Sequence, residues 1–241
     1  MFLFNLQPMS HYNKQLFLFT LVSSLIAPIA LSGTELSPQN SILVENFSPG
    51  STKDKIPDGW RSTQKDLSMF SFGKEGDNFF TTVSSNRSCN SIGKRFASSP
   101  KEYPFLSWKW RVHKLPEGGT ELKKDKNDSG AGIYVIFKGY LKLNPIIKYV
   151  WSSSLPVGTL TTSPYNKNAK IVVLESGPEK TGQWVMEHVN VYEDYKRLFG
   201  GNPPDIEAFG ILTDSDNTKS SALADYDDIF ISQKSTLVSS R

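Results

Sequence analysis

The sequence predicts an all-β protein, an antiparallel β-sandwich or jelly roll with one short helix. Apolar and polar residues alternate along many short segments, and clusters of Gly, Pro, Asn, Asp and Ser separate these segments. Only one stretch has apolar residues at helical spacing, which argues against an α/β enzyme fold. The balance of 38% hydrophobic and 21% charged residues also excludes collagen, low-complexity disorder and a polytopic membrane protein.

The N-terminal segment has the features of an export signal. Residues 16–31 are predominantly apolar, Lys14 precedes them, and the run is shorter than the roughly 20 residues that a membrane-spanning helix needs. Small residues around Ser32 fit a cleavage site, and a retained membrane anchor is the alternative. We therefore expect a signal peptide at 1–32, a mature domain at 33–232, a polar tail at 233–241, a periplasmic or extracellular location, and no transmembrane span after cleavage.

Alternation predicts nine strands in the mature domain. The clearest covers Leu106–Val112, where its apolar residues share one parity while Ser107, Lys109 and Arg111 share the other. Trp108 and Trp110, which belong to the apolar set, are therefore expected in the core. The other predicted strands are Ile42–Phe47, Phe79–Val83, Ile133–Phe137, Ile146–Trp151, Ile171–Glu175, Trp184–Val189, Phe209–Thr213 and Tyr226–Ile231.

One helix is predicted at residues 191–199. Asn190 followed by Glu193 resembles a capping box, in which the first side chain accepts a hydrogen bond from the helix N-terminus. Aromatic residues recur at helical spacing, and Gly200 stands where a left-handed C-cap belongs. By contrast, the charge-rich segment 114–130 is expected to be a long mobile loop.

Composition and motifs exclude several classes of function. With 27 basic against 24 acidic residues and no long basic run, the net charge of +3 gives no indication of nucleic-acid binding. The chain has no phosphate-binding loop, no HExxH zinc motif, no GxSxG elbow and no CxxC pair. Cys89 is the only cysteine, so no intramolecular disulfide can form, and we expect an unpaired surface or edge-strand thiol. These absences favour a protein without catalytic activity, but they do not decide whether it is an enzyme.

Carboxylates are the candidate catalytic residues. Glu187 lies in a predicted strand, and Asp214 and Asp216 follow another strand in the segment ILTDSDNT. Two of them would act as general acid and base on a glycan if they lie close together and one pKa is raised. The alternative is that Asp214, Asp216 and their polar neighbours form a turn by hydrogen bonding to their own backbone.

Trp151 is the candidate ligand-binding aromatic residue. It closes the predicted strand Ile146–Trp151 and precedes SSSLPVGT, so we expect it at the rim of a loop. A flat, exposed aromatic ring offers a stacking surface to a sugar. The sequence therefore predicts a ligand contact at Trp151.

Six stretches carry a pattern that is typical of a known family. They are, in chain order, YPFLSWKWRV, AGIYVIF, YVWSSSLPVGT, KIVVLESG, GQWVMEHVNVYEDYKRLFGGNPPDIEAFGILTDSDNT and ADYDDIFI. Together they resemble the bacterial domain of unknown function (DUF) 3047 family over residues 42–231, and the most specific part runs from Trp184 to Ile229. Since that family has no established activity, the resemblance implies export in bacteria and a β-rich domain but no reaction.

Short motifs at both ends of the mature domain carry a second, shorter likeness. VENF contains Glu45, DGW covers residues 58–60, and YDDIF contains Asp228. Together they are similar to galactose-binding-type jelly rolls, in which the first and last strands often hold a structural calcium ion. The resemblance thus implies a metal site at Glu45 and Asp228, completed by backbone carbonyls. The alternative is that each carboxylate faces solvent or pairs with Lys or Arg.

These observations lead to one first hypothesis and two alternatives. The first is a non-catalytic binding module, with carbohydrate or another envelope glycan as the first ligand class, because five Trp and nine Tyr accompany the lack of a catalytic motif. The alternatives are a glycan-active enzyme that uses a carboxylate pair and a structural or partner-binding envelope protein. Two carboxylates close together in a groove would favour the enzyme, and an exposed apolar patch would favour the partner-binding protein.

Overall fold

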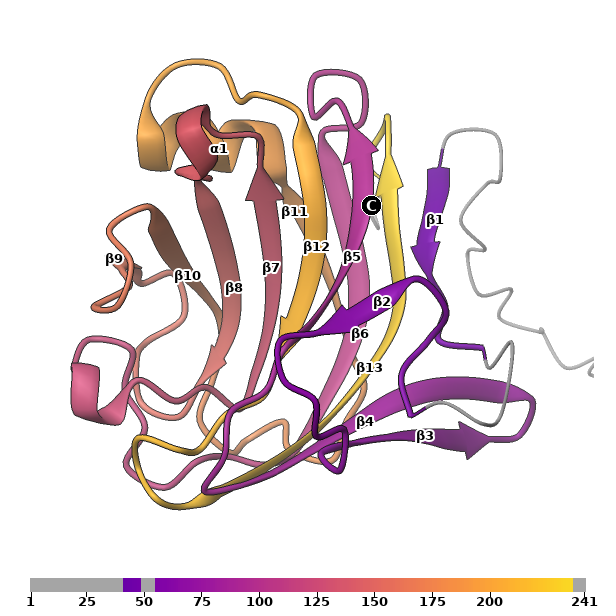
Figure 1. Ribbon diagram of the computed structural model, residues 1–241, viewed down its shortest axis with the longest axis vertical. Coiled ribbons are helices and arrows are strands. Elements are labelled where there is room, and N and C mark those ends of the chain that lie inside the picture. Colours follow the sequence, from indigo (N-terminus) through magenta and orange to yellow (C-terminus); the bar gives the residue numbers. More distant parts are fainter. Residues whose placement is uncertain (1–40, 49–54, 236–241) are drawn as a thin grey trace, which may run out of the picture. The chain divides into compact units, whose positions relative to one another are not determined.

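The computed structural model describes residues 41–48 and 55–235, which form two β-sheets packed face to face (Figure 1). The predicted signal peptide lies outside the described residues, as does most of the predicted tail. The six-stranded sheet contains β1 (Ser41–Glu45), β3 (Phe70–Glu75), β4 (Asn78–Asn86), β6 (Phe105–Lys114), β11 (Val185–Asn190) and β13 (Ser221–Ser232). The seven-stranded sheet contains β2 (Trp60–Ser62), β5 (Ile92–Ser98), β7 (Ala131–Phe137), β8 (Ile146–Ser152), β9 (Leu160–Thr162), β10 (Ala169–Ser176) and β12 (Ile206–Leu212).

The order of the strands confirms the predicted all-β sandwich. The first sheet has the order β11-β6-β13-β4-β3, with β1 beside the C-terminal half of β13, and the second has the order β2-β5-β12-β7-β8-β10-β9. Strands β8 and β10 are parallel, whereas the other pairs are antiparallel. The chain passes repeatedly from one sheet to the other, as in a jelly roll.

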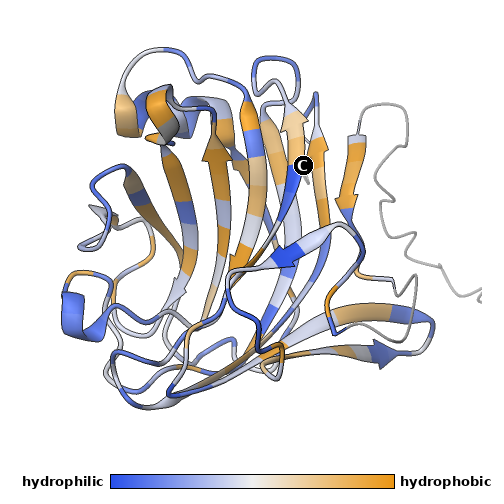
Figure 2. Ribbon diagram, in the orientation of Figure 1, coloured by the Kyte–Doolittle hydropathy of each residue, from blue (hydrophilic) through white to orange (hydrophobic). Residues whose placement is uncertain are grey.

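The core lies between the two sheets and follows the predicted alternation. Trp108 and Trp110 of β6 are fully buried, whereas the side chain of Lys109 between them is partly exposed. Ile133 and Val135 of β7, from the opposite sheet, belong to the same buried cluster. Figure 2 shows that hydrophobic residues are concentrated on the strands. Burial of such side chains is the main favourable contribution to folding.

The helix is confirmed where the sequence predicts it. Helix α1 covers Val191–Phe199, and the Asn190 side chain accepts a hydrogen bond of 3.0 Å from the backbone N–H of Glu193. Gly200 ends the helix with a φ of 75°, a region that favours glycine. Two short 3₁₀ turns are also present, η2 (Lys124–Lys126) and η3 (Tyr140–Lys142).

Each of the nine predicted strands overlaps an observed one, and residues 41–48 and 55–235 contain four further strands that were not predicted. The additional strands are β2, β3, β5 and β9. Within the described ranges, no helix has both the length and the apolar character needed to cross a membrane.

Candidate functional site

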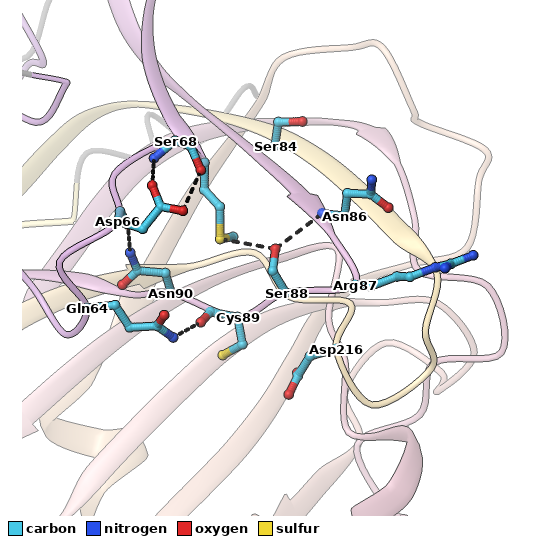
Figure 3. A pocket seen from close by; sticks show the side chains of 11 residues that line it. Gln64, Asp66, Ser68, Ser84, Asn86, Arg87, Ser88, Cys89, Asn90 and Asp216 are labelled. Atoms are coloured by element: carbon cyan, nitrogen blue, oxygen red, sulfur yellow. Dashed lines mark hydrogen bonds between the residues drawn. The ribbon is translucent and has the colours of Figure 1, made fainter.

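A pocket of about 730 Å³ lies where three strand connections meet (Figure 3). The connections are β2–β3, β4–β5 and β12–β13. Polar side chains line the pocket almost throughout, and Met69 is the aliphatic exception. The lining residues are Gln64, Asp66, Ser68, Met69, Ser84, Asn86, Arg87, Ser88, Cys89, Asn90 and Asp216.

Strand pairing explains why these distant connections come together. The first residue of β5, Ile92, lies opposite Ile211, close to the end of the antiparallel strand β12. The segment before β5 and the segment after β12 therefore lie at the same end of the strands of the seven-stranded sheet. Ser215 joins them, because its backbone N–H donates to the Ser88 carbonyl at 3.2 Å and its hydroxyl lies 2.6 Å from the Ser85 hydroxyl.

Asn90 ties the β2–β3 connection to the floor of the pocket. Its amide nitrogen donates to the Asp66 carbonyl at 2.7 Å, and its amide oxygen accepts a hydrogen bond of 2.8 Å from the Ser62 hydroxyl. The Gln64 side chain in turn donates to the Cys89 carbonyl. Figure 3 shows the contacts of Asn90 with Asp66 and of Gln64 with Cys89. The wall is thus held by hydrogen bonds between side chains and backbone.

At one side of this pocket, Cys89, Asp214 and Asp216 form a cluster. The Cys89 sulfur and carboxylate oxygens of the two aspartates lie within 4.8 Å of one another. Asp214 is 6% exposed and accepts a hydrogen bond of 2.8 Å from the Ser129 backbone N–H. Burial, reinforced by the neighbouring Asp128 carboxylate, raises the pKa of Asp214 to about 8. The predicted residues Asp214 and Asp216 are therefore brought together, and Asp214 is largely protonated at neutral pH.

Cys89 is partly buried in this cluster and is not a nucleophile at neutral pH. Burial, followed by the charges of Asp214 and Asp216, raises the pKa of the thiol to about 12. Only the thiolate attacks an electrophile, so the protonated thiol has low reactivity. Within the described residues, Cys89, Asp214 and Asp216 lie close enough together to share a metal ion. Their sulfur and oxygen ligands are typical of zinc sites rather than calcium sites.

Lys148 and Tyr134 extend the polar region onto the outer face of the seven-stranded sheet. The Lys148 ammonium lies 4.6 Å from the centre of the Tyr134 ring. Burial lowers the pKa of Lys148, and the nearby Asp214 carboxyl opposes this change. Gly210 lies opposite Tyr134 on one side and opposite Gly93 on the other, so the sheet beside the ring carries no side chain at these two positions.

The long loop predicted at residues 114–130 is present between β6 and β7, and its last residues anchor the site. Asp128 is fully buried and accepts hydrogen bonds from the Thr218 backbone N–H at 2.6 Å and from the Thr218 hydroxyl at 2.5 Å. It also accepts one of 3.0 Å from the Asn217 side chain. Sequence reasoning missed Asp128, because the charge-rich composition of the segment indicates solvent exposure and gives no sign of a distant partner.

Residues 58–230 match the family described as "Protein of unknown function (DUF3047)", and this span includes the whole pocket and the carboxylate cluster. The chain belongs to the DUF3047 family. It matches none of the curated proteins.

Three solved structures illustrate what this DUF3047 chain is similar to, each with a TM-score of 0.40 or less. The family 11 carbohydrate-binding module of Lic26A-Cel5E of Clostridium thermocellum has 9% identity and a TM-score of 0.40, with 81% of this chain and 95% of that chain covered. The Caldicellulosiruptor saccharolyticus CBM27-1, solved with mannohexaose, has 9% identity, a TM-score of 0.40 and coverage of 82% and 99%. The family 11 xylanase from Neocallimastix patriciarum has 12% identity, a TM-score of 0.36 and coverage of 81% and 97%.

The third carboxylate candidate of the DUF3047 chain, Glu187, belongs to different surroundings. The charges that act on it are those of Glu175 and Lys180, and the Trp110 side chain donates to it at 3.1 Å. Burial, with the Glu175 charge, raises the pKa of Glu187 to about 7. The charges that act on Asp214 come instead from the loop cluster and Lys148. The structure therefore separates Glu187 from the other two candidates.

Trp151 does not lie at a loop rim, so that expectation is wrong. Its side chain is fully buried, its indole N–H donates to the Gly177 carbonyl at 3.0 Å, and its ring lies 6.1 Å from the Trp110 ring. The segment after β10 covers the end of β8, and its Gly177 carbonyl accepts the hydrogen bond from the indole N–H. A ring without exposed surface offers nothing for a sugar to stack on, so the predicted ligand contact at Trp151 gains no support.

Glu45 and Asp228 each have a lysine partner, which is the alternative that the sequence left open. Glu45 accepts hydrogen bonds from the Trp60 side chain at 2.8 Å and from Lys94 at 3.0 Å. Asp228 pairs with Lys109 at 2.5 Å. Their strands lie side by side, as the predicted site requires, because Glu45 is opposite Ile229. A shared calcium ion stays a prediction.

Proposed function

We propose that this DUF3047 domain binds a polyhydroxylated ligand, with a carbohydrate or another envelope glycan as the first class to test, in the pocket between Gln64 and Asp216. The observation that carries the proposal is the lining itself. The residues that line this volume of about 730 Å³ carry amides, hydroxyls, a guanidinium and carboxylates, and the volume is within the range of small-molecule sites.

The chemistry of the lining suits hydroxyl groups, which both donate and accept hydrogen bonds. Side-chain amides such as Asn86 also do both, whereas Arg87 only donates and the Asp216 carboxylate only accepts. Hydrogen bonds to charged groups are about twice as strong as those between neutral groups. The charged lining residues Asp66, Arg87 and Asp216 are therefore expected to contribute most to affinity.

A glycan array followed by titration calorimetry on each positive ligand tests this proposal. Asp216→Asn should weaken binding about tenfold, because it removes a charged acceptor while keeping the shape of the side chain. Asp58→Asn is the matched control, since Asp58 is exposed and lies outside the pocket. Affinity that is the same in the wild-type protein and in Asp216→Asn, or the absence of any glycan ligand, would contradict the proposal.

A glycan-active enzyme is the second candidate, favoured by the close pair Asp214 and Asp216. Burial raises the pKa of Asp214 to about 8, so this member of the pair holds a proton that an acid catalyst would donate. Asp214→Asn separates the two candidates, because Asp216 lines the pocket and Asp214 does not. If the wild-type protein releases reducing sugar and Asp214→Asn binds the glycan without releasing it, the enzyme is favoured. If both proteins bind the glycan equally and neither releases sugar, the binding module is favoured.

Export to the periplasm or the outside of the cell is part of the proposal. It is supported by the apolar run at 16–31 and by the cation before it. Mass spectrometry of the protein from its host should give an N-terminus close to residue 33. An N-terminus at Met1 would contradict cleavage.

A further inference from the structure

The connection between β7 and β8, residues 138–145, projects apolar side chains into solvent. Tyr140, Leu141 and Leu143 are 83%, 75% and 63% exposed, the three highest values for large apolar side chains among the described residues. Three such residues within four positions form an apolar tip, whereas single exposed apolar residues are ordinary. We call residues 139–143 the β7–β8 tip.

The backbone of this tip is held in a shape that keeps these side chains outside. Leu141 has a φ of 50° and a ψ of 38°, a left-handed conformation that disfavours a leucine. At Gly139 a side chain would collide with the Leu143 carbonyl, so the close approach needs glycine. Asn144 closes the base, because its side chain donates to the Phe137 carbonyl at 2.6 Å and to Glu207 at 2.7 Å.

We propose that the β7–β8 tip inserts Tyr140, Leu141 and Leu143 into the interface of a lipid bilayer. Stable protein partners typically bury about 800 Å² on each side, far more than one turn presents. Insertion into lipid needs only a projecting apolar group, and tyrosine is favoured at the depth of the headgroups. The tip is a projection held by its base, so it supplies the convex shape that insertion requires.

The charges beside the tip indicate which force holds it at the membrane. Lys138 forms an ion pair of 3.0 Å with Asp205, and Glu207 lies at the base of the tip through its hydrogen bond with Asn144. These two acidic groups offset the positive charges of Lys138 and Lys142, which would otherwise attract anionic lipids. Binding is therefore driven by the apolar side chains and depends only weakly on anionic lipid.

The test uses a fluorophore whose emission reports its surroundings, attached to the full-length chain. Leu143→Cys carries the label in a Cys89→Ser background, and Val157→Cys is the matched control, because Val157 is 62% exposed and lies on a different loop. Vesicles of phosphatidylethanolamine and phosphatidylglycerol should shift the emission to shorter wavelength at position 143 and leave it unchanged at 157. Since this readout is local, binding of residues 16–31 to the vesicle does not imitate it.

A second variant tests whether the apolar side chains cause insertion. Leu141→Asn, which tolerates the left-handed conformation, should lower the inserted fraction of the labelled chain about tenfold at limiting lipid. Phosphatidylcholine vesicles should give nearly the same shift as anionic ones. An absent shift, an equal shift at 157, full insertion of Leu141→Asn, or self-association through the tip in sedimentation without vesicles would overturn the proposal.

Discussion

At the residue scale, Asp214 gives the sharpest prediction, because its pKa is raised to about 8 from the ordinary value of 3.8. The folded state keeps the proton that the unfolded state loses, so the stability of the wild-type protein falls as pH rises between about 4 and 8, by up to about 1.4 kcal/mol per pH unit. Asp214→Asn removes this cost, since its amide oxygen still accepts from Ser129. The variant should match the wild type near the low end of the window and become the more stable of the two as pH rises, as thermal unfolding at several pH values would reveal.

Asp205→Asn is the control for this titration, because the Asp205 side chain is half-exposed. Its difference from the wild type should stay small and nearly constant over the same pH window. A constant difference between Asp214→Asn and the wild type would show that Asp214 is ionised in the folded protein at neutral pH.

Some site residues could be recognised individually from the sequence, but their partners could not. Asp214 and Asp216 follow a predicted strand and were candidates for that reason, whereas Cys89 lies 125 residues earlier in a polar stretch. Their proximity depends on the pairing of β5 with β12, and β5 was not predicted. Trp151 illustrates the opposite error, because no local pattern indicates that Gly177 covers the strand end.

At the scale of elements, helix α1 depends on its N-cap. Asn190→Ala removes the acceptor for the Glu193 N–H and should lower the free energy of unfolding by about 1 kcal/mol. Asn190→Ser keeps an acceptor at this position and should lower the free energy of unfolding by only about a few tenths of a kcal/mol. Chemical denaturation measures both differences, and equal losses in the two variants would argue against capping.

Strand β6 makes the second prediction about an element. Trp108→Ala should destabilise the protein by about 3–5 kcal/mol, because it empties a fully buried site between Trp110 and Tyr149. Lys109→Ala should cost less than about 1 kcal/mol, since its ion pair with Asp228 is partly exposed. Denaturant titration of both variants compares the two faces, and similar small losses would mean that the strand is inverted.

The strands that were predicted are those with a complete apolar face. In β6 the inner residues from Leu106 to Val112 are all large and apolar, whereas a lysine stands at an inner position of β3 (Lys74) and of β5 (Lys94). The three-residue strands β2 and β9 are too short for alternation to show. Periodicity therefore missed the strands that are very short or whose apolar face is interrupted.

At the scale of the whole molecule, Glu45 joins the two sheets. It lies on β1 of one sheet, whereas Trp60 on β2 and Lys94 on β5 belong to the other. Glu45→Ala should cost about 3 kcal/mol, because it leaves both donors in a largely buried place without their acceptor. Asp228→Asn should cost less than about 1 kcal/mol, since its ion pair stays within one sheet and is more exposed. Thermal and chemical unfolding of the two variants would contradict this assignment if the order were reversed.

A calcium titration tests whether Glu45 and Asp228 bind the predicted metal ion in addition to forming the observed ion pairs with lysine. A cation that binds only the folded protein raises the melting temperature as its concentration rises. If Glu45 and Asp228 share calcium, chelated wild-type protein should regain stability with added calcium and Asp228→Asn should not. An unchanged melting temperature in the wild type would contradict the calcium site and leave Glu45 and Asp228 as members of two ion pairs with lysine.

Strand β7 starts beside the buried Asp214–Ser129 contact and ends at the β7–β8 tip. Its seven residues, at about 3.3 Å each, separate the two by roughly 20 Å. A molecule resting on a bilayer by this tip would therefore hold its binding pocket clear of the headgroups. A long or branched ligand could then enter from the aqueous side while the protein stays at the surface, so lipid contact and ligand capture would not compete for space.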